Sequence, residues 1–394
     1  MKKQTQAIHL EYERRDAYDS LSVPVYNTLA YEFDNAAVMA EAFTDKIKAP
    51  DYSRVENPTV TNLERRVAAL TDAAHATAFN SGMAAISNTL MALAAQGKNI
   101  VTSKHLFGNT YALLVATLRR FGVKVRLRDL TNIEAVREAI DDDTCCVFLE
   151  ILTNPQLEVA DLKAISEVAH EKNVHLVVDS TVIPFTQFSA KSLGVDIEVV
   201  SSSKYVSGGA TSLGGLVIDY GTPYNGDFAK RLYGEMLFNF GAYMTPQVAY
   251  MQTIGLETLD ARYRVQSSNA LELAKKLRSL PQIKLVNYVG LEDNPYHELA
   301  QRQFGKTAGA MICIDLESKE ACFSFLNNLK LIHRATNLFD NRSLAIHPAS
   351  TIFGAFSENM RKSMDVKDTT IRLSIGLEDV DDLFEDIKQA VDSL

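Results

Sequence analysis

Residues 175–204 read HLVVDSTVIPFTQFSAKSLGVDIEVVSSSK, and this stretch decides the fold class. It holds two short apolar runs, HLVV at 175–178 and IEVV at 197–200, and polar residues follow each run directly. Apolar runs of this length, rich in Val and Ile, are typical of strands that are buried on both faces of a parallel sheet. The stretch therefore predicts two strands of one sheet, each with polar side chains at its carboxyl end.

The same pattern extends over residues 56–246. Further strand-like runs are NIVTS, VKVRLRD, CCVFLEI and SLGGLVID, and helical stretches such as TYALLVATLRRFG and DLKAISEVAHEKN lie between several of them. Short strands that alternate with helices of about 10–15 residues indicate βαβ units and a mostly parallel sheet with both faces covered. We expect one large α/β domain here.

The two ends of the chain read differently. Residues 1–55 have few periodic signals, and VPVYNTLAYEF reads as an extended segment, so we expect an N-terminal arm. In residues 247–394, a helical passage precedes the β-rich runs KLVNYV, GAMICIDL and TTIRLSIGLE, and the helix DVDDLFEDIKQAVDSL closes the chain. This order predicts a smaller C-terminal α+β domain.

Composition narrows the function classes. Lys and Arg total 40 against 49 Asp and Glu, a net charge of −9, which argues against nucleic-acid binding and favours small-molecule substrates. No stretch approaches ~18 unbroken apolar residues, and the N-terminus lacks a signal sequence, so we expect no membrane partner. The four cysteines, in no CxxC spacing, favour neither a metal site nor disulfides. A cytoplasmic location fits them best.

Residues at the predicted strand ends and at one helix start, most of them polar, are expected to share one edge of the sheet. They are Ser81, Gly82, Met83, Asn154, Asp179, Ser201, Ser203 and Lys204. The sequence Ser-Gly-Met at a helix start offers free N–H groups and the positive end of the helix dipole, which suit a phosphate. Asp179 could keep a ring nitrogen protonated, and a desolvated Lys204 could form a Schiff base. Together these are the contributions that pyridoxal phosphate requires from a protein.

Each of these residues also has an ordinary structural interpretation. A Ser-Gly pair before a helix is commonly a cap, an Asp after a strand is commonly a turn residue, and a strand-end lysine is commonly solvated. Only their order and their shared edge support the combined interpretation.

The sequence resembles the Cys/Met-metabolism family of fold-type I pyridoxal-phosphate enzymes. The likeness covers nearly the whole chain, and its specific motifs are YSRVENPTVTNLERRVAAL, FNSGMAAI, LVVDST and SSSKYVSGG, in that order and spacing. The family includes cystathionine synthases and lyases, methionine γ-lyase and O-acetylhomoserine sulfhydrylase. The resemblance implies an aspartate-aminotransferase-like large domain with a mostly parallel sheet, a smaller C-terminal domain and an N-terminal arm.

The resemblance also implies roles for individual residues. Lys204 would be the cofactor-linked lysine and the proton shuttle, Asp179 the partner of the ring nitrogen, and Asn154 a contact of the cofactor's 3-oxygen. The phosphate would be bound by Ser81, Gly82, Met83, Ser201 and Ser203, with Tyr52 and Arg54 reaching it from a neighbouring subunit. Arg372 would bind the substrate carboxylate, beside Asn337, and Phe107 would stack on the cofactor ring. The implied assembly is a homotetramer built as a dimer of dimers.

Three motifs resemble the sulfhydrylase branch in particular: TSLGG at 211–215, GLETL at 255–259 and NLFDNRSLAIHPAST at 337–351. Asn337 stands where lyases and cystathionine synthases commonly carry serine. The chain also departs from that branch, because Phe107 replaces a tyrosine, Gly209 replaces a histidine and HPASTIF replaces HPASTTH. We expect Phe107, which has no proton to exchange, to disfavour thioether cleavage, unless Tyr111 supplies a hydroxyl instead.

The expected activity is γ-replacement on O-acetyl-L-homoserine by sulfide or a small thiol, giving homocysteine or methionine, a step of methionine biosynthesis. Alternatives within the family are methionine γ-lyase and cystathionine γ-synthase or lyase. An idle scaffold on the same fold is disfavoured because Lys204 and Asp179 are both present. The acyl group and the sulfur donor stay open at this point.

Overall fold

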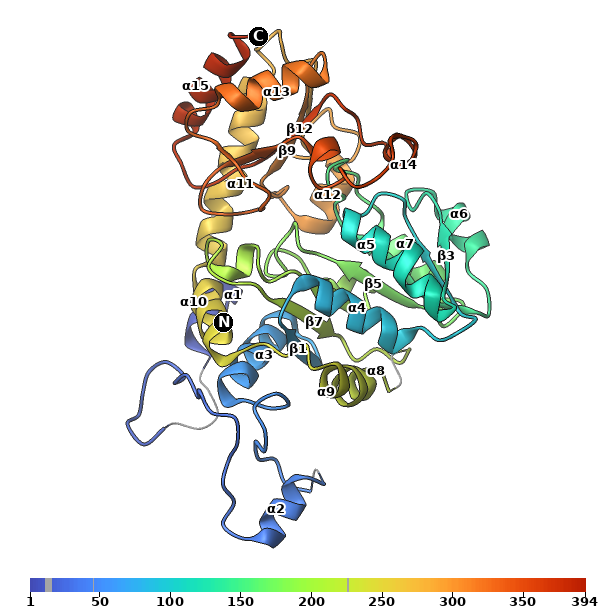
Figure 1. The fold of residues 1–394 in the computed structure, drawn as a ribbon, viewed down its shortest axis with the longest axis vertical. Helices are drawn as coiled ribbons and strands as arrows, with labels where there is room; N and C mark the ends of the chain where they lie inside the picture. The colour runs from blue at the N-terminus through green and yellow to red at the C-terminus, as the bar shows by residue number, and fades with distance from the viewer. Residues whose placement is uncertain (11–15, 45, 225–226) are drawn as a thin grey trace.

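The computed structural model describes residues 1–10, 16–44, 46–224 and 227–394. Two β-sheets dominate it, one in the lower part of Figure 1 and one in the upper part. The strands are β1 (His75–Phe79), β2 (Asn99–Thr102), β3 (Lys124–Leu127), β4 (Thr144–Glu150), β5 (His175–Asp179), β6 (Ile197–Val200), β7 (Gly215–Asp219), β8 (Leu285–Asn287), β9 (Met311–Asp315), β10 (His333–Arg334), β11 (Leu344–Ile346) and β12 (Thr370–Ser374).

Helices surround both sheets. They are α1 (Lys3–His9), α2 (Ala36–Ala42), α3 (Pro58–Thr71), α4 (Gly82–Leu93), α5 (Gly108–Ala112), α6 (Ile133–Ala139), α7 (Leu162–His170), α8 (Phe228–Arg231), α9 (Phe238–Phe240), α10 (Pro246–Glu257), α11 (Leu259–Leu277), α12 (His297–Phe304), α13 (Lys319–Asn328), α14 (Glu358–Ser363) and α15 (Val380–Val391). In the described parts of the chain, no helix is long and apolar enough to cross a membrane.

The larger sheet has seven strands in the order β1-β7-β6-β5-β4-β2-β3. Strand β7 runs antiparallel to both of its neighbours, and the other neighbouring pairs are parallel. This confirms the predicted mostly parallel sheet. Alternate residues of one strand enter different cores: Val147 and Leu149 of β4 pack in one cluster, while Cys146 and Phe148 pack in another. Both faces are therefore buried, which explains the unbroken apolar runs.

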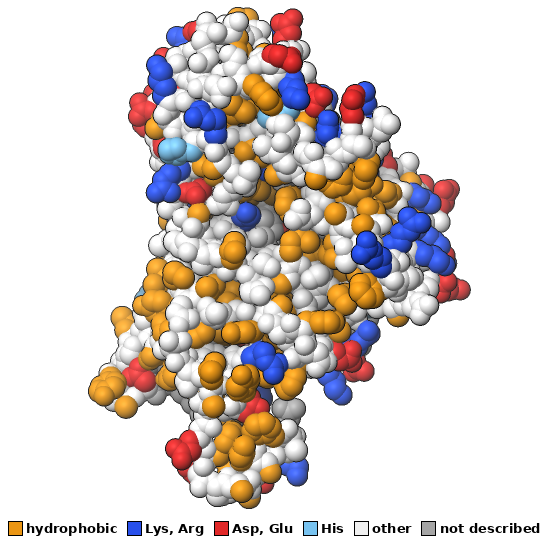
Figure 2. Space-filling model, in the orientation of Figure 1, with side chains coloured by type: hydrophobic (Ala, Val, Ile, Leu, Met, Phe, Trp, Pro, Cys, Tyr) orange, Lys and Arg blue, Asp and Glu red, His pale blue; other side chains and the backbone are white. Residues whose placement is uncertain are grey.

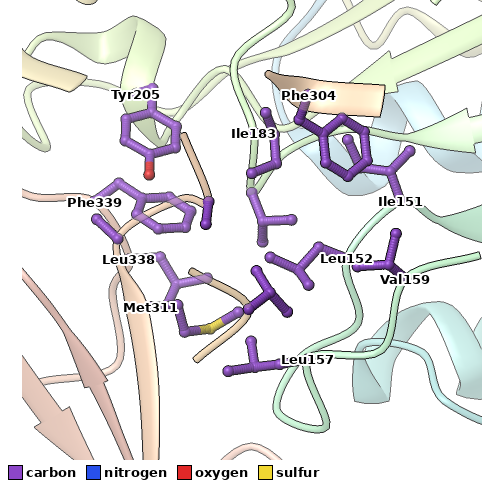
Figure 3. Packing of buried hydrophobic residues seen from close by; sticks show 14 of the residues in the cluster. Ile151, Leu152, Leu157, Val159, Ile183, Tyr205, Phe304, Met311, Leu338 and Phe339 are labelled. Carbon is purple, nitrogen blue, oxygen red and sulfur yellow. The ribbon is translucent and has the colours of Figure 1, made fainter. Parts of the chain in front are cut away.

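The smaller sheet has the order β10-β11-β12-β9-β8, and its pairs are antiparallel except β10 with β11. Helix α11 packs against α15, β8 and β9 of this part, whereas α10, just before it, packs against α3 of the larger part. The core is continuous between the two sheets, as Figure 3 shows for Leu152 and Ile183 on one side and Met311 and Leu338 on the other. The domain limits at residues 55 and 246 remain predictions.

The N-terminal segment has two parts. Helix α1, which the sequence did not predict, packs on the body, since Ala7 is buried and Lys3 Nζ donates to the carbonyls of Phe185 and Phe188. Helix α2 and its flanking segments project away from the body (Figure 1). Residues 11–15 and 45 of the expected arm lie outside the described residues.

Candidate active site

A cavity of about 430 Å³ lies between the two parts of the molecule, at the carboxyl ends of β4, β5 and β6. Figure 2 shows a hollow there, with a basic side chain inside it and apolar side chains around it. Its lining residues are Gly82, Met83, Ile86, Phe107, Glu150, Leu152, Asn154, Asp179, Thr181, Val182, Ser201, Lys204, Thr336, Leu338, Thr351, Ile352 and Arg372. Eight of the predicted site residues are therefore brought together in one place.

One end of the cavity is built around the start of α4. Ser81 Oγ accepts a hydrogen bond from the Ala84 N–H (3.1 Å), and the Ser81 carbonyl accepts one from Ala85 (3.0 Å). These capping bonds leave the N–H groups of Gly82 and Met83, at the positive end of the helix dipole, available for an anion. Gly82 is required for the approach of Ser201, because a Cβ on Gly82 would stand 2.6 Å from the Ser201 Cβ.

The two predicted serine ligands differ in position. Ser201 lines the cavity, and its N–H donates to Thr181 Oγ1 (2.8 Å). Ser203 is turned to the neighbouring loop, where its Oγ accepts from the Gly214 N–H (2.9 Å) and donates to the Gly214 carbonyl (3.1 Å). Ser203 is therefore not among the lining residues, and its hydroxyl must rotate before it can contact an anion.

Lys204 lines the cavity and follows β6. Its Nζ donates to Asn337 Oδ1 at 2.8 Å. Burial, and then the positive charge of Arg372, lowers the pKa of Lys204 to about 8. A large fraction of the amine is therefore neutral near pH 8, and a neutral amine is the nucleophilic form.

Asp179 has a second buried carboxyl group, that of Glu150, beside it. The two residues are paired across β4 and β5, and both line the cavity. Burial raises the pKa of Asp179, although hydrogen bonding to Thr181 opposes the shift. Burial, and then the charge of Asp179, raises the pKa of Glu150 to about 8, so Glu150 is mostly protonated at neutral pH.

Glu150 was missed by the sequence interpretation. It accepts a hydrogen bond from the Phe107 N–H at 2.5 Å and so fixes the start of α5. The only sequence signal was a carboxylate inside the apolar run CCVFLEI, one residue before its end. Asn154 was the predicted polar residue at that strand end, and Glu150 was therefore not considered.

Arg372 is the second cation of the site, and it comes from β12 of the smaller sheet. It is 2% exposed, and it donates to Asn154 Oδ1 (3.2 Å) and to the Asn337 carbonyl (3.3 Å). Its Nε has no hydrogen-bond partner, and no carboxylate among the described residues forms an ion pair with it. Burial lowers its pKa to about 10, which still leaves it charged. A buried guanidinium with free donors is a binding site for a carboxylate.

Apolar side chains, among them Phe107, Leu338 and Ile352, form most of the rest of the lining. The Tyr111 ring is directed to Phe356, with centroids 5.9 Å apart and planes at 74°, and Tyr111 is not among the lining residues. No tyrosine hydroxyl of the described chain reaches the cavity.

Tyr52 and Arg54 lie outside this cavity. Tyr52 is 41% exposed, and the Arg54 guanidinium stands 5.5 Å from its ring centroid. Arg54 also donates to the Phe238 carbonyl. The structure does not place this pair at its own chain's site, and a role in a neighbour's site remains a prediction.

Comparison with known proteins decides the family. The model of the Cys/Met metabolism PLP-dependent enzymes matches residues 4–392. The chain belongs to this family. This Cys/Met metabolism enzyme is 37% identical over 394 residues to an L-methionine gamma-lyase of Fusobacterium nucleatum subsp. polymorphum, covering 99% of this chain and 98% of that one. It is 31% identical over 417 residues to the O-acetyl-L-homoserine sulfhydrylase of Corynebacterium glutamicum, covering 98% and 95%.

A crystal structure of a candidate O-acetylhomoserine (thiol)-lyase from Campylobacter jejuni subsp. jejuni superposes on the Cys/Met metabolism enzyme with a TM-score of 0.95. The two are 35% identical, and each chain is fully covered. That protein carries a pyridoxyl-lysine phosphate residue. The fold is therefore fold-type I, the protein is an enzyme, and its cofactor is pyridoxal phosphate.

The residues present fit this cofactor. Free N–H groups at the start of α4 and the Ser201 hydroxyl suit its phosphate, a buried carboxyl at Asp179 suits its ring nitrogen, and a partly neutral amine at Lys204 suits its aldehyde. None of these groups contacts the Arg372 Nε, which has no hydrogen-bond partner.

Proposed function

We propose that the enzyme exchanges the acetate of O-acetyl-L-homoserine for sulfide or a small thiol. In the net reaction the Cγ–O bond breaks, acetate leaves with the bonding electrons, a Cγ–S bond forms, and the thiol loses its proton. Homocysteine or methionine results, which is a step of methionine biosynthesis. A cytoplasmic location belongs to this proposal, and the four free cysteines, all in the described part of the chain, support it.

The observation that carries the proposal is the aromatic residue at the cavity. Phe107 has no hydroxyl, and Tyr111 packs on Phe356 instead of replacing it. A departing thiolate benefits from a proton donor, whereas acetate is a weak base and departs with less help. A cavity whose own chain places no tyrosine hydroxyl at Phe107 supports O-acetylhomoserine over a thioether as the substrate.

The charges of the lining residues support an uncharged acyl group and an uncharged acceptor. Lys204 and Arg372 are the two basic residues among them, and both are needed for the reacting amino acid. The carboxylate of a succinyl group or of cysteine would have no basic partner from this chain. An unpaired buried charge costs about 1–3 kcal/mol or more, so such substrates are expected to bind at least about tenfold more weakly.

The side chains divide the work in this scheme. Arg372 binds and orients the α-carboxylate, and Lys204 Nζ takes the Cα proton, then a Cβ proton, and returns protons to the product. Asn337 holds the Lys204 amine between these transfers. When bound, pyridoxal phosphate withdraws electrons from Cα, and Asp179 supports this by holding the ring nitrogen protonated.

A methionine γ-lyase is the second candidate. The observation in its favour is that L-methionine gamma-lyases are among the relatives, at 34–37% identity, which is close to the 31–34% of the sulfhydrylases. The two reactions share the same early proton transfers and differ in whether a thiol is captured or released. The residues around Phe107 therefore decide between them.

A product assay tests the function. The purified enzyme is given O-acetyl- or O-succinylhomoserine with sulfide, methanethiol or cysteine, and separately methionine alone. We expect homocysteine and methionine from the O-acetyl ester with the first two donors, and little 2-oxobutanoate from methionine. Abundant 2-oxobutanoate and ammonia from methionine would establish the lyase instead.

The substitution Phe107→Tyr tests the reason. Supplying a phenol at the cavity is expected to raise methionine cleavage about tenfold relative to acetate replacement, because general acids contribute about 10²–10⁴-fold where they are well placed. Tyr111→Phe is the matched control, since it removes a hydroxyl that packs away from the cavity. A wild-type enzyme that already cleaves methionine as fast as Phe107→Tyr contradicts the argument.

We also propose a homotetramer made of two dimers, in which Tyr52 and Arg54 bind the cofactor phosphate of the neighbouring subunit. The projecting segment around α2 supports this, since it exposes apolar residues such as Leu29, Met39 and Phe43. The pair also lies outside its own chain's cavity.

Subunit mixing tests the shared site. Arg54→Ala and Lys204→Ala homomers are both expected to be nearly inactive, whereas a hybrid dimer has one site with Lys204 and a neighbour's Arg54 both intact. Mixing after partial denaturation and refolding should therefore restore up to about a quarter of wild-type activity under random pairing. If no activity returns although the hybrids form on native gels, the site is not shared in this way.

A further inference from the structure

A buried imidazole, that of His105, lies between two carboxylates. His105 is 6% exposed. Its Nδ1 stands 2.5 Å from Glu158 Oε2, and its Nε2 stands 2.8 Å from Asp365 Oδ2. Lys104 Nζ contacts the same Asp365 oxygen at 2.7 Å. The lining residues of the main cavity include none of these four.

This geometry requires a protonated ring. A neutral imidazole has a single N–H, whereas each nitrogen of His105 faces a carboxylate that accepts when ionised. Burial lowers the pKa of His105, but the hydrogen bonds and charges of Glu158 and Asp365 outweigh burial and raise it. Lys104 adds a positive charge to this group through its ion pair with Asp365. His105 and Glu150, which is mostly protonated near neutral pH, both line a small void of about 20 Å³.

The two carboxylates belong to different parts of the molecule. Glu158 follows β4 of the larger sheet, whereas Asp365 lies just after α14, in the stretch 347–366 that precedes β12 of the smaller sheet. The same stretch carries Thr351 and Ile352, which line the active-site cavity. His105 therefore joins this stretch to the larger part of the molecule.

The stretch 347–366 packs closely on the start of α5. A Cβ on Gly108 would stand 2.8 Å from the Ile352 carbonyl oxygen. Phe353 and Met364 are buried in a small cluster against which Tyr111 packs. Apart from this cluster, Gln156 Nε2 donates to the Met364 carbonyl (2.7 Å), one residue before Asp365. The contacts of Asp365 therefore hold one end of a stretch that is otherwise packed against the start of α5.

His105 precedes Phe107 by two residues, and Phe107 stands in the cavity wall together with Ile352. We propose that His105 is a positioning residue. Its ring, which is hydrogen-bonded to a carboxylate on each side, holds the stretch 347–366 against the loop before α5 and so fixes the positions of Phe107 and Ile352 in the cavity wall. The proposal does not depend on whether the enzyme replaces acetate or cleaves methionine.

The pH dependence has a definite sign. A histidine whose folded pKa is raised contributes its stabilisation fully below its ordinary pKa of about 6.5, and this is lost as pH rises through the folded value. The fastening should therefore weaken on the alkaline side. Because 55% of the Asp365 side chain is exposed, solvent screens its charge, and we expect changes of about three- to tenfold rather than more.

Hydrogen–deuterium exchange of the holoenzyme, followed by mass spectrometry, tests this between pH 6 and 9. After correction for intrinsic rates, amides of 347–366 should exchange about three- to tenfold faster at the alkaline end. His105→Gln retains an N–H donor but cannot be protonated, so the increase of the 347–366 exchange rate with pH should vanish. Asp365→Asn, at an exposed position, should raise exchange at low pH without unfolding the protein.

Lys104→Gln is the matched control, because it removes the other partner of Asp365 and leaves His105 in place. Lys104→Gln should retain the wild-type increase of the exchange rate with pH. In steady-state kinetics, His105→Gln should raise the KM of the thiol or amino-acid substrate with little change in kcat. A wild type with no such increase, or an increase that survives in His105→Gln, overturns the proposal. A uniform loss of thermal stability without any change in this increase overturns it equally, since it would show a merely structural role.

Discussion

Replacing Lys204 by alanine is expected to reduce turnover of any substrate by about 10³-fold or more, since proton transfer by a well-placed group contributes about 10²–10⁴-fold and the same residue anchors the cofactor. The structure offers no substitute in the described chain, because the other basic residue of the cavity, Arg372, stays protonated. The neutral fraction of Lys204 near pH 8, which burial creates, is lost with the side chain.

Steady-state kinetics and the visible absorption spectrum measure this effect. Lys204→Ala should still bind pyridoxal phosphate reversibly but should lose it on gel filtration, and borohydride should no longer fix it to the chain. Added methylamine should recover a small part of the activity. Lys172→Ala, at an exposed lysine outside the cavity, is the matched control and should behave as wild type. Near-normal turnover in Lys204→Ala would mean that another residue carries the chemistry.

The second large effect is expected at Arg372. Removing one partner of a buried, hydrogen-bonded charge pair typically costs 2–5 kcal/mol, so Arg372→Leu should lower kcat/KM for amino-acid substrates roughly 10²–10³-fold. Arg372→Lys should recover only part of this loss, because an ammonium group cannot form the two parallel bonds of a guanidinium. Cofactor binding should stay intact in both variants, since Arg372 is assigned to the substrate.

Stability separates this role from a structural one. The Arg372 charge is buried without a carboxylate partner from the described chain, so Arg372→Leu should not lower the unfolding temperature of the substrate-free protein appreciably. A substrate analogue that lacks the α-carboxylate should react equally poorly with wild type and variant. Arg334→Leu, at an exposed position of the same sheet, is the control. A strong preference of Arg372→Leu for acids over that analogue would contradict the assignment.

Part of this site was predictable because strand ends in a parallel sheet meet at one edge. Apolar runs locate β4, β5 and β6, and the residues after them, Asn154, Asp179 and Lys204, do line one cavity. The alternation of strands and helices was sufficient to predict the α/β fold class, because that alternation indicates a parallel sheet. Arg372 needed the family resemblance, since an arginine inside a β-strand carries no local signal of a ligand.

Other features depend on tertiary contacts that leave little trace in the sequence. Strand β1 is not rich in β-branched residues, and its pairing partner β7 lies far along the chain. The expected helix over 110–122 continues from α5 into a π-helical turn at Leu113–Thr117 and a 3-10 turn at Leu118–Phe121. The hydroxyl of Ser203 bonds to Gly214, a partner that no pattern around Lys204 indicated. The contact of His105 with Asp365 spans 260 positions of the chain.

Asn337 receives a hydrogen bond from Lys204 through its side chain and one from Arg372 through its carbonyl, so it lies where the two sheets meet. The groups proposed to face the cofactor come from the larger part, and the arginine proposed to bind the substrate carboxylate comes from the smaller sheet. A substrate held between Lys204 and Arg372 would bridge the two sheets, so a change in how the sheets pack would move its α-carboxylate relative to the lysine.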